Sequence, residues 1–367
     1  TLSGEANNAS FLINNDIVIS LGVMNADQIL LGYPEKPSNP ALLHRRFFPS
    51  KVGGQPAWLN PQHLPPLSDL QCPRCRTPMT FILQVYASLD ASSCFHRTIF
   101  LFGCQPCGNQ FVAMRNQLPR DNAFYPFEPP DTDNVSGVGD EEEDEFKSLL
   151  CPVCGLPKGD GEAGSSPDTS PAAKEGRRGD DKAALIPRGH RRCRRVSEDG
   201  MLVGVFEEYE LEVDEEGEED ADKQGDYSHE MELKRRYDEV AKDNPDATLD
   251  ESEQQFFEEF APPSCRNDDT FQTFLKRVRT NPGHVLRYAY EGAPLWFASA
   301  QQLEDGPPDC DTCGSPRVFE FQVQPELIHL LKLDKLEWGI LAVYTCSANC
   351  GGEGYVKEFV YRQPEPM

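Results

Sequence analysis

Positive charge and long apolar runs are what this chain has least of. It carries 35 Lys and Arg residues against 61 Asp and Glu in 367 residues, for a net charge of −26 at pH 7. Because proteins that bind nucleic acid present a basic face, this composition argues against direct nucleic-acid binding. No run of about twenty apolar residues occurs, so we predict no membrane-spanning segment and no membrane partner.

Recognisable catalytic constellations are also missing. We find no phosphate-binding loop, no set of nucleophile, base and orienting group, and no acid pair in a pocket context. His96 stands alone between two cysteine pairs, and we interpret it as a hydrogen-bonded structural residue rather than as a catalyst. We therefore expect a protein without enzymatic activity.

The acidity is concentrated in the middle of the chain. Residues 131–260 carry a net charge of −23, whereas residues 1–130 carry +1 and residues 261–367 carry −4. This stretch is either a solvated, self-repelling linker or a complement to a strongly basic partner. Within it, residues 187–195 form a basic island. This island is either a nuclear-import signal or an intramolecular binding partner for the acidic runs.

A pattern of nine residues occurs twice, at a constant offset of 238 positions. Such self-similarity is the signature of a structural repeat. The first set is Gly54, Pro56, Trp58, Cys72, Cys75, Pro78, Phe81, Gln84 and Val85, and the second is Gly292, Pro294, Trp296, Cys310, Cys313, Pro316, Phe319, Gln322 and Val323. We call residues 54–117 the first repeat and residues 292–363 the second repeat. The two tryptophans either close the core of each repeat or cap a groove.

Each repeat contains a second cysteine pair, so each can supply four thiolates to one metal ion. Pairs of this spacing are typical of structural zinc sites. A redox motif of thioredoxin type stands alone before a helix, whereas these pairs flank β sequence. We predict two structural Zn²⁺ sites, one formed by Cys72, Cys75, Cys104 and Cys107 and the other by Cys310, Cys313, Cys346 and Cys350.

A third cluster in the acidic stretch is a weaker candidate for zinc. Cys151 and Cys154 are followed at some distance by His190 and Cys193. These four side chains have the chemistry of a zinc site, but the sequence between the pairs is of low complexity. The sequence leaves open whether this third set holds an ion.

Apolar patterns predict mostly strands in the two repeats. We expect strands over residues 81–87, 98–102 and 111–115, over 318–323, 339–345 and 355–361, and over 11–13, 17–19 and 29–33. We expect helices within 226–260, over 268–280 and over 327–336. Residues 327–333 are either a core helix or a nuclear-export peptide, and we prefer the core. Residues 131–222 have too few large apolar side chains to offset the entropy of ordering, so we expect disorder there.

These features predict a mostly β (α+β) protein with two zinc-ribbon-like β lobes, derived from the internal repeat. An acidic, largely disordered linker with short helices would join the lobes. The expected divisions are residues 1–130 for the N-terminal lobe, 131–260 for the linker and 261–367 for the C-terminal lobe.

Several stretches of the two repeats resemble the programmed cell death protein 2 family. They are "FFPSKVGGQPAWLNP", "CPRCRTPMTFILQVYA" and "FHRTIFLFGC" near the first repeat, and "VLRYAYEGAPLW", "CDTCGSPRVFEFQVQPELIHLL" and "LEWGILAVYTCSANC" in the second. Many members carry a MYND zinc finger between the lobes. Here only Cys151, Cys154, His190 and Cys193 match its ends, so the chain resembles a MYND-less or degenerate-MYND branch, similar to the Tsr-four proteins.

The resemblance implies a dedicated chaperone for one newly made, basic protein of the small ribosomal subunit, named uS-five or, in eukaryotes, Rps-two. The rival expectations are a zinc-dependent adaptor in transcription, cell-cycle or apoptosis regulation, and a ubiquitin ligase. The last would need cross-braced ligands within one compact domain. We expect a monomer in a reducing compartment, the cytoplasm, with shuttling to the nucleus.

Overall fold

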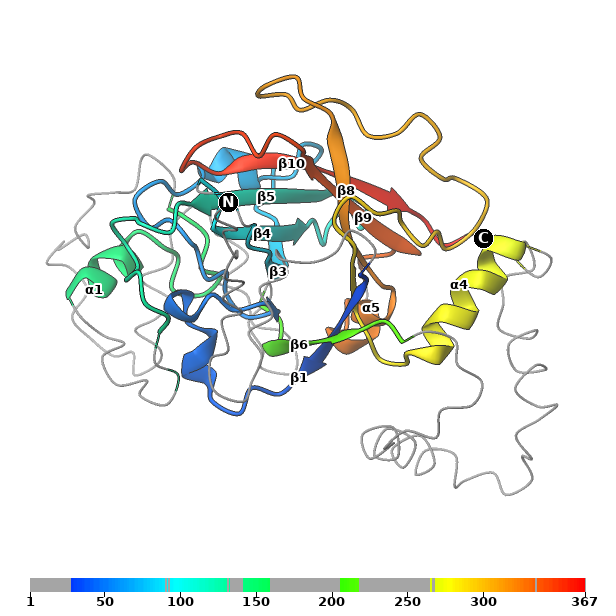
Figure 1. The fold of residues 1–367 in the computed structure, drawn as a ribbon, viewed down its shortest axis with the longest axis horizontal. Coiled ribbons are helices and arrows are strands. Elements are labelled where there is room, and N and C mark those ends of the chain that lie inside the picture. The colour runs from blue at the N-terminus through cyan, green and yellow to red at the C-terminus, as the bar shows by residue number, and fades with distance from the viewer. Residues whose placement is uncertain are drawn as a thin grey trace, which may run out of the picture.

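Ten antiparallel strands form one closed barrel, which is the body of the molecule (Figure 1). This computed structural model describes residues 28–89, 91, 93–130, 132, 141–158, 205–217, 265, 268–333 and 335–366. Around the barrel the strands follow the order β1-β6-β2-β3-β4-β5-β10-β9-β8-β7. Their bounds are β1 Leu30–Glu35, β2 Lys51–Val52, β3 Thr80–Tyr86, β4 His96–Gly103, β5 Phe111–Leu118, β6 Tyr209–Glu215, β7 Leu286–Tyr288, β8 Arg317–Val323, β9 Ile340–Cys346 and β10 Val356–Gln363.

Short helices accompany the barrel. Within the described residues they are α1 Glu141–Ser148, α4 Asp269–Thr280 and α5 Glu326–Leu330, together with the 3-10 helices Pro40–Leu43, Arg45–Phe47 and Leu67–Leu70. Helix α4 begins as predicted, because the Asp268 carboxylate accepts hydrogen bonds from the amides of Thr270 (2.9 Å) and Phe271 (3.3 Å). In this part of the chain, no helix has both the length and the apolar character that crossing a membrane requires.

Each repeat contributes the same three-stranded unit. Strands β3, β4 and β5 pair in sequence order in the first repeat, and β8, β9 and β10 do so in the second. The register shifts between Phe81 and Leu83 in β3, and between the equivalent Phe319 and Phe321 in β8. Because the same register shift occurs in both repeats, it is a structural feature of the unit. A shift of this kind bends the strand locally.

The two units share an edge, and this overturns the prediction of two separate lobes. Strands β5 and β10 pair directly, with Ala113 opposite Glu358 and Arg115 opposite Val356. Each three-stranded unit alone would leave two open edges with unpaired backbone groups, whereas a closed barrel leaves none. The correct description is therefore one barrel built from both repeats, not two separate lobes.

The acidic stretch also supplies part of the barrel, and this corrects the expectation of disorder over residues 131–222 for residues 205–217. Strand β6 inserts between β1 and β2 and pairs with both. Its apolar side chains alternate with acids: Leu211 is buried in the core, with Tyr209 and Val213 packed against it, whereas Glu212 is exposed. Helix α1 and residues 150–157 are ordered as well.

The remaining sequence expectations agree with the structure at most positions. The strands expected in the two repeats are present, with ends that differ by a few residues. Helix α5 is shorter than the expected 327–336, but Leu327, Leu331 and Leu333 are buried, so the core interpretation is confirmed over the export peptide. The expected strands at 11–13 and 17–19 and the expected helix at 226–260 lie outside the described residues, as does the basic island at 187–195.

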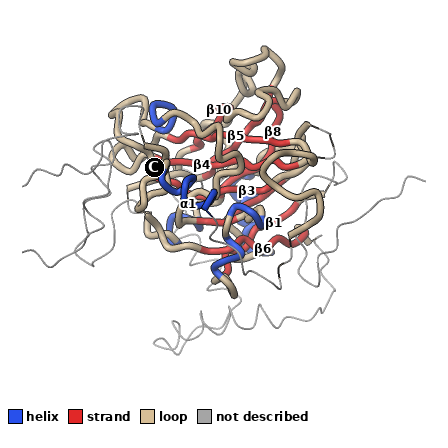
Figure 2. The backbone as a smooth tube through the Cα atoms, turned by 90° about the vertical axis from the view of Figure 1, so that its left-hand side faces the viewer, coloured by secondary structure: helices blue, strands red, loops and turns tan. Residues whose placement is uncertain are grey.

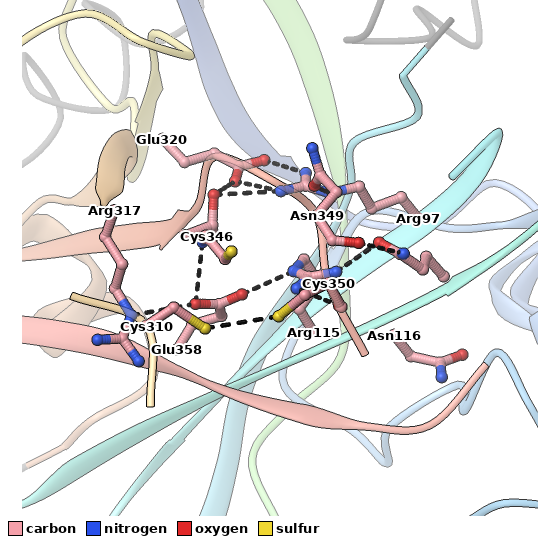
Figure 3. A network of polar contacts seen from close by, with 12 residues as sticks. Arg97, Arg115, Asn116, Cys310, Arg317, Glu320, Cys346, Asn349, Cys350 and Glu358 are labelled. Carbon is pink, nitrogen blue, oxygen red and sulfur yellow. Dashed lines mark hydrogen bonds and ion pairs between the residues drawn. The ribbon is translucent and has the colours of Figure 1, made fainter. Parts of the chain in front are cut away.

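The barrel interior is apolar over much of its length and polar at one end. Apolar side chains from every strand meet in one cluster, which includes Leu83, Leu101, Phe321 and Trp338. At the polar end, charged side chains from the two repeats meet in a connected network (Figure 3).

Two buried ion pairs in this network cross from one repeat to the other. Arg97 of β4 makes a bidentate contact with Glu320 of β8, with 2.7 Å between Nη2 and Oε2, and both side chains are fully buried. The Tyr288 hydroxyl also donates to Glu320. Burial by itself lowers the pKa of Arg97, but the Glu320 carboxylate outweighs burial and leaves that pKa above its usual value. Arg97 therefore keeps its positive charge beside the Glu320 carboxylate.

The second pair joins the edges at the β5–β10 seam. Arg115 Nε donates to Glu358 Oε1 at 2.7 Å, and Arg317 Nε reaches the other oxygen of the same carboxylate at 3.4 Å. Glu358 is fully satisfied in this way, because its Oε2 also accepts from the Cys346 amide at 3.1 Å. A buried carboxylate requires such partners, and here an arginine from the other repeat provides one of them.

Replacing Arg97 with Met tests whether these contacts hold the barrel together. The substitution leaves Glu320 buried without its partner, so the free energy of unfolding should fall by about 3–5 kcal/mol in urea titrations. Adding Glu320→Gln should recover part of the loss. Arg362→Met is the control, because Arg362 pairs with a Glu337 side chain that is 77% exposed and should matter far less. Unchanged stability of Arg97→Met would contradict this account.

Candidate metal centres

The four predicted cysteines of the first repeat lie together at one end of β4 and β5. Cys72 and Cys75 come from the turn before β3, and Cys104 and Cys107 come from the turn between β4 and β5. All four Sγ atoms lie within 4.8 Å of one another. The Cys72–Cys107 distance is 3.8 Å and the Cys75–Cys104 distance is 3.4 Å. Cys72 and Cys104 are buried, whereas Cys75 is exposed.

The second repeat reproduces this arrangement. Its thiols also lie within 4.8 Å of one another, with 3.5 Å between Cys310 and Cys350 and 3.5 Å between Cys313 and Cys346. The burial pattern is the same, because the second cysteine of the first pair is again the exposed one. The repeat therefore extends to the placement of each thiol.

Backbone hydrogen bonds hold the leading turn of each quartet. The Cys72 amide donates to Thr77 O and the Arg76 amide donates to Cys72 O, both at 2.9 Å. The Cys310 amide donates to Ser315 O and the Gly314 amide to Cys310 O, both at 2.8 Å. Each turn requires a left-handed residue after its second cysteine, with φ of 58° at Arg76 and 71° at Gly314. The thiols are thus positioned by the backbone.

Each quartet fits one tetrahedral metal ion. Four sulfurs at about 2.3 Å from an ion stand about 3.8 Å apart, close to the distances found here. Disulfide sulfurs would be only about 2.0 Å apart, so the described cysteines are thiols. Four protein ligands leave no coordination position open, which is the arrangement of a structural site rather than a catalytic one.

Hydrogen bonding and burial act on the thiols in opposite directions. Hydrogen bonds with the Thr77 and Ser315 side chains lower the pKa of Cys75 and of Cys313 to about 6. Burial raises the pKa of Cys104 and of Cys350. Because a bound cation requires thiolates, an ion must displace protons from the buried thiols, and its affinity should weaken as the pH falls.

The backbone of each quartet accepts a hydrogen bond from the opposite repeat. Arg115 of the first repeat donates to Cys350 O at 2.8 Å, in the second quartet. In the first quartet the Glu337 amide of the second repeat donates to Gly108 O at 3.2 Å. Gly108 has a φ of 75°, and a Cβ there would lie 2.6 Å from Lys335 O. The placement of each thiol quartet and the closure of the barrel therefore depend on each other.

The third cysteine pair forms the same turn as the other two. The Cys151 amide donates to Leu156 O at 2.8 Å, and the Gly155 amide donates to Cys151 O at 2.9 Å. Gly155 has the left-handed φ of 67°, and both thiols are buried. His190 and Cys193 lie outside the described residues, so the third site stays a prediction. We call residues 150–157 the linker knuckle.

The linker knuckle packs on the outer face of β3, β4 and β5. Trp58 Nε1 donates to Gly155 O at 2.8 Å, and the Gln55 side chain donates to the carbonyls of Pro152 (3.0 Å) and Val153 (2.9 Å). Helix α1 lies over the same face, in front of β3 and β4 in Figure 2. Trp58 is fully buried, which confirms its core interpretation, whereas Trp296 is half-buried.

The structure agrees with the structural interpretation of His96. Its ring stacks on Phe48, with 4.3 Å between centroids, and Nδ1 lies 3.0 Å from the Tyr86 hydroxyl. Burial, aided by the positive charge of Arg120, lowers its pKa to about 4. The ring is therefore neutral at physiological pH.

Sequence reasoning missed the buried charges and the linker knuckle. The signal for Arg97 and Glu320 was a charge inside an apolar strand, as in "HRTIFLF" and "VFEFQV". The signal for the linker knuckle was the spacing C-P-x-C-x-x-P, which is common to residues 72–78 and 151–157.

Single cysteine substitutions test the metal centres. Cys72→Ser and Cys310→Ser should each lower the metal content of the purified protein by one ion per chain and disrupt cooperative folding, because a structural ion contributes folding free energy. Cys94→Ser is the matched control, since Cys94 is buried outside both quartets and should leave the metal content unchanged. Elemental analysis and circular dichroism provide the readouts. A folded, metal-free Cys72→Ser/Cys310→Ser double variant would refute the structural role.

Comparison with known proteins matches both repeats to one family. The model described as "Programmed cell death protein 2, N-terminal domain" matches residues 28–132, and "Programmed cell death protein 2, C-terminal putative domain" matches residues 268–364. The first match ends before α1 and the second begins at the N-cap of α4. Strand β6 and the linker knuckle therefore lie in the stretch that neither model covers. No solved structure matches the chain.

Relatives from several organisms span most of the chain. Programmed cell death protein 2 of Bos taurus is 36% identical over 332 residues, which are 86% of this chain and 91% of that protein, and the Rattus norvegicus protein is 35% identical over 336 residues, with the same coverage. "Probable 20S rRNA accumulation protein 4" of Schizosaccharomyces pombe is 32% identical over 110 residues, 25% of this chain and 28% of that protein. The chain belongs to the programmed cell death protein 2 family.

Proposed function

We propose that this chain is a zinc-bound chaperone without enzymatic activity. Its client is a newly synthesised, basic protein of the small ribosomal subunit, uS-five (Rps-two in eukaryotes), and its role is to support small-subunit biogenesis. It acts as a monomer in the cytoplasm, with shuttling to the nucleus.

Similarity to a protein named for 20S rRNA is the observation that carries this proposal. The name of the Schizosaccharomyces pombe relative refers to accumulation of that RNA. A chain with a net charge of −26 is poorly suited to contact RNA itself, because like charges repel. A basic protein that accompanies RNA is a better electrostatic match.

The placement of the acidic stretch supports a basic client. Strand β6 fixes part of this stretch on the barrel, with Glu212, Asp214 and Glu215 exposed. A concentrated negative field speeds encounter with a positively charged protein and disfavours acidic ones. The same field would shield the client from stray RNA.

Zinc is the metal that we propose for both quartets. Four thiolates in a tetrahedral set are the ligands of structural Zn²⁺, and the closed coordination shell supports a scaffolding role. A third ion, held by Cys151 and Cys154 together with His190 and Cys193, would fix the linker knuckle to the rest of the acidic stretch.

A zinc-dependent adaptor in transcription, cell-cycle or apoptosis regulation is the alternative function. The names of the mammalian relatives, which refer to programmed cell death, favour it. An adaptor would bind several regulatory proteins, whereas a dedicated chaperone would bind one client at near-equal amount.

Purification of the tagged full chain from cells in mild salt tests the proposal. We expect one basic small-subunit ribosomal protein at near-equal amount by mass spectrometry, without the rest of the subunit, and its release as the salt concentration rises, because screening weakens the charge contacts. Whole subunits, or regulatory proteins with no basic ribosomal protein, would contradict it.

A further inference from the structure

The two repeats carry equivalent apolar faces on the outside of the barrel. Phe81 and Phe319 occupy the same repeat position in β3 and β8. Strand register extends the equivalence, since Phe102 pairs with Val112 in the first repeat and Tyr344 pairs with Phe359 in the second. Phe100 likewise pairs with Met114, and Ala342 with Tyr361. Trp58 and Trp296 complete the two faces.

The face of the first repeat is covered by the acidic stretch of the same chain. Phe146 of α1 and the linker knuckle pack against it, and Trp58, Phe102 and Met114 are fully buried. The indole of Trp58 donates to a backbone carbonyl, Gly155 O. An apolar platform, one indole N–H and the Gln55 side chain thus hold a turn of polypeptide on this face.

The face of the second repeat is less covered. Trp296 and Tyr361 are only half-buried, whereas their equivalents in the first repeat, Trp58 and Met114, are fully buried. Phe359 is half-buried, like its equivalent Val112. The Trp296 ring packs edge-on against Tyr361, with centroids 5.9 Å apart. Among the described residues, no hydrogen bond uses the Trp296 indole N–H, and no second knuckle lies over this face.

An acidic loop borders this face. The loop between β7 and β8, orange in Figure 1, projects from the barrel near β8 and β10. The Tyr361 hydroxyl anchors it by donating to Gln301 O at 2.8 Å. Residues 299–316 contain no Lys or Arg, and their four acids, Glu304, Asp305, Asp309 and Asp311, are all exposed.

We propose that the Trp296–Phe359–Tyr361 face, with its acidic loop, is the surface that holds the basic client. The inference rests on the proposed function and assigns its binding site. The occupant is a segment rich in Lys and Arg with an apolar anchor, whose backbone carbonyl accepts the Trp296 N–H as Gly155 O accepts that of Trp58. Two features of this surface favour cationic side chains: the exposed carboxylates of the loop and the half-buried aromatic rings.

Tryptophan fluorescence tests whether the client covers the Trp296–Phe359–Tyr361 face, and it requires no substitution. Trp296 is the half-buried one of the three tryptophans, whereas Trp58 and Trp338 are fully buried, so acrylamide quenching reports mainly on Trp296. The free full chain should be quenched, and added purified uS-five should protect it. If Trp296 is already shielded in a free monomer, a segment of this chain covers the face, and the inference fails. If it is shielded in a dimer seen by sedimentation, a second copy covers the face, and the inference also fails.

Matched variants distinguish specific binding at this surface from non-specific electrostatic attraction to the acidic chain. Trp296→Ala, and separately Glu304→Lys/Asp305→Lys, should weaken uS-five binding by about tenfold or more, as expected for a central anchor and its charged rim. Glu212→Lys/Asp214→Lys makes the same change of charge on β6, away from this face, and should have a much smaller effect. Metal content and circular dichroism confirm folding of each variant.

The possible outcomes distinguish a failure of the proposed binding surface from a failure of the proposed chaperone function. Binding by Trp296→Ala at wild-type affinity would overturn this surface and leave the proposed function intact. Equal losses for the loop and β6 charge variants would show that net charge alone acts, and would also overturn it. If the wild-type chain binds polylysine as tightly as uS-five, or does not bind uS-five, both proposals fail.

Discussion

Two buried carboxylates of the second repeat, Glu320 and Glu358, are each paired with an arginine of the first repeat. A buried carboxylate without such partners would cost several kcal/mol, so neither repeat can bury its charged residues alone. The rest of the barrel follows from this dependence. The β5–β10 seam brings the partners together, and the interior closes around them.

The same dependence connects the seam to the metal quartets. Glu358 accepts from the amide of Cys346, and Arg115 donates to Cys350 O, so one ion pair organises the backbone of two thiol-bearing residues. The first quartet is held in turn by Glu337 of the second repeat. A duplicated unit has thereby become two halves of one structure, in which strand pairing, the thiol quartets and buried charge support one another.

Local pattern was enough to predict the strands of the repeats and the two cysteine quartets, because each depends on residues close in sequence or on a repeated spacing. Closure of the barrel was not predictable in this way, since pairing of β5 with β10 joins segments about 240 residues apart. Strand β6 was missed because Tyr209, Leu211 and Val213 alternate with acids inside an acidic run. The acidic composition favoured disorder. However, β1 and β2 would each have an open edge without β6, and a segment of alternating apolar and acidic residues can pair with both edges.

The central claim is that the two repeats form one barrel and unfold together. The most direct test is urea unfolding of the metal-loaded chain, with a separate signal recorded from each repeat in one sample. Incorporated 5-fluorotryptophan gives separate fluorine NMR signals for Trp58 in the first repeat and Trp296 in the second. If the repeats form one barrel, both native signals should disappear at the same urea concentration. Separate midpoints for the two signals would show that the repeats are independent domains, and would contradict the account.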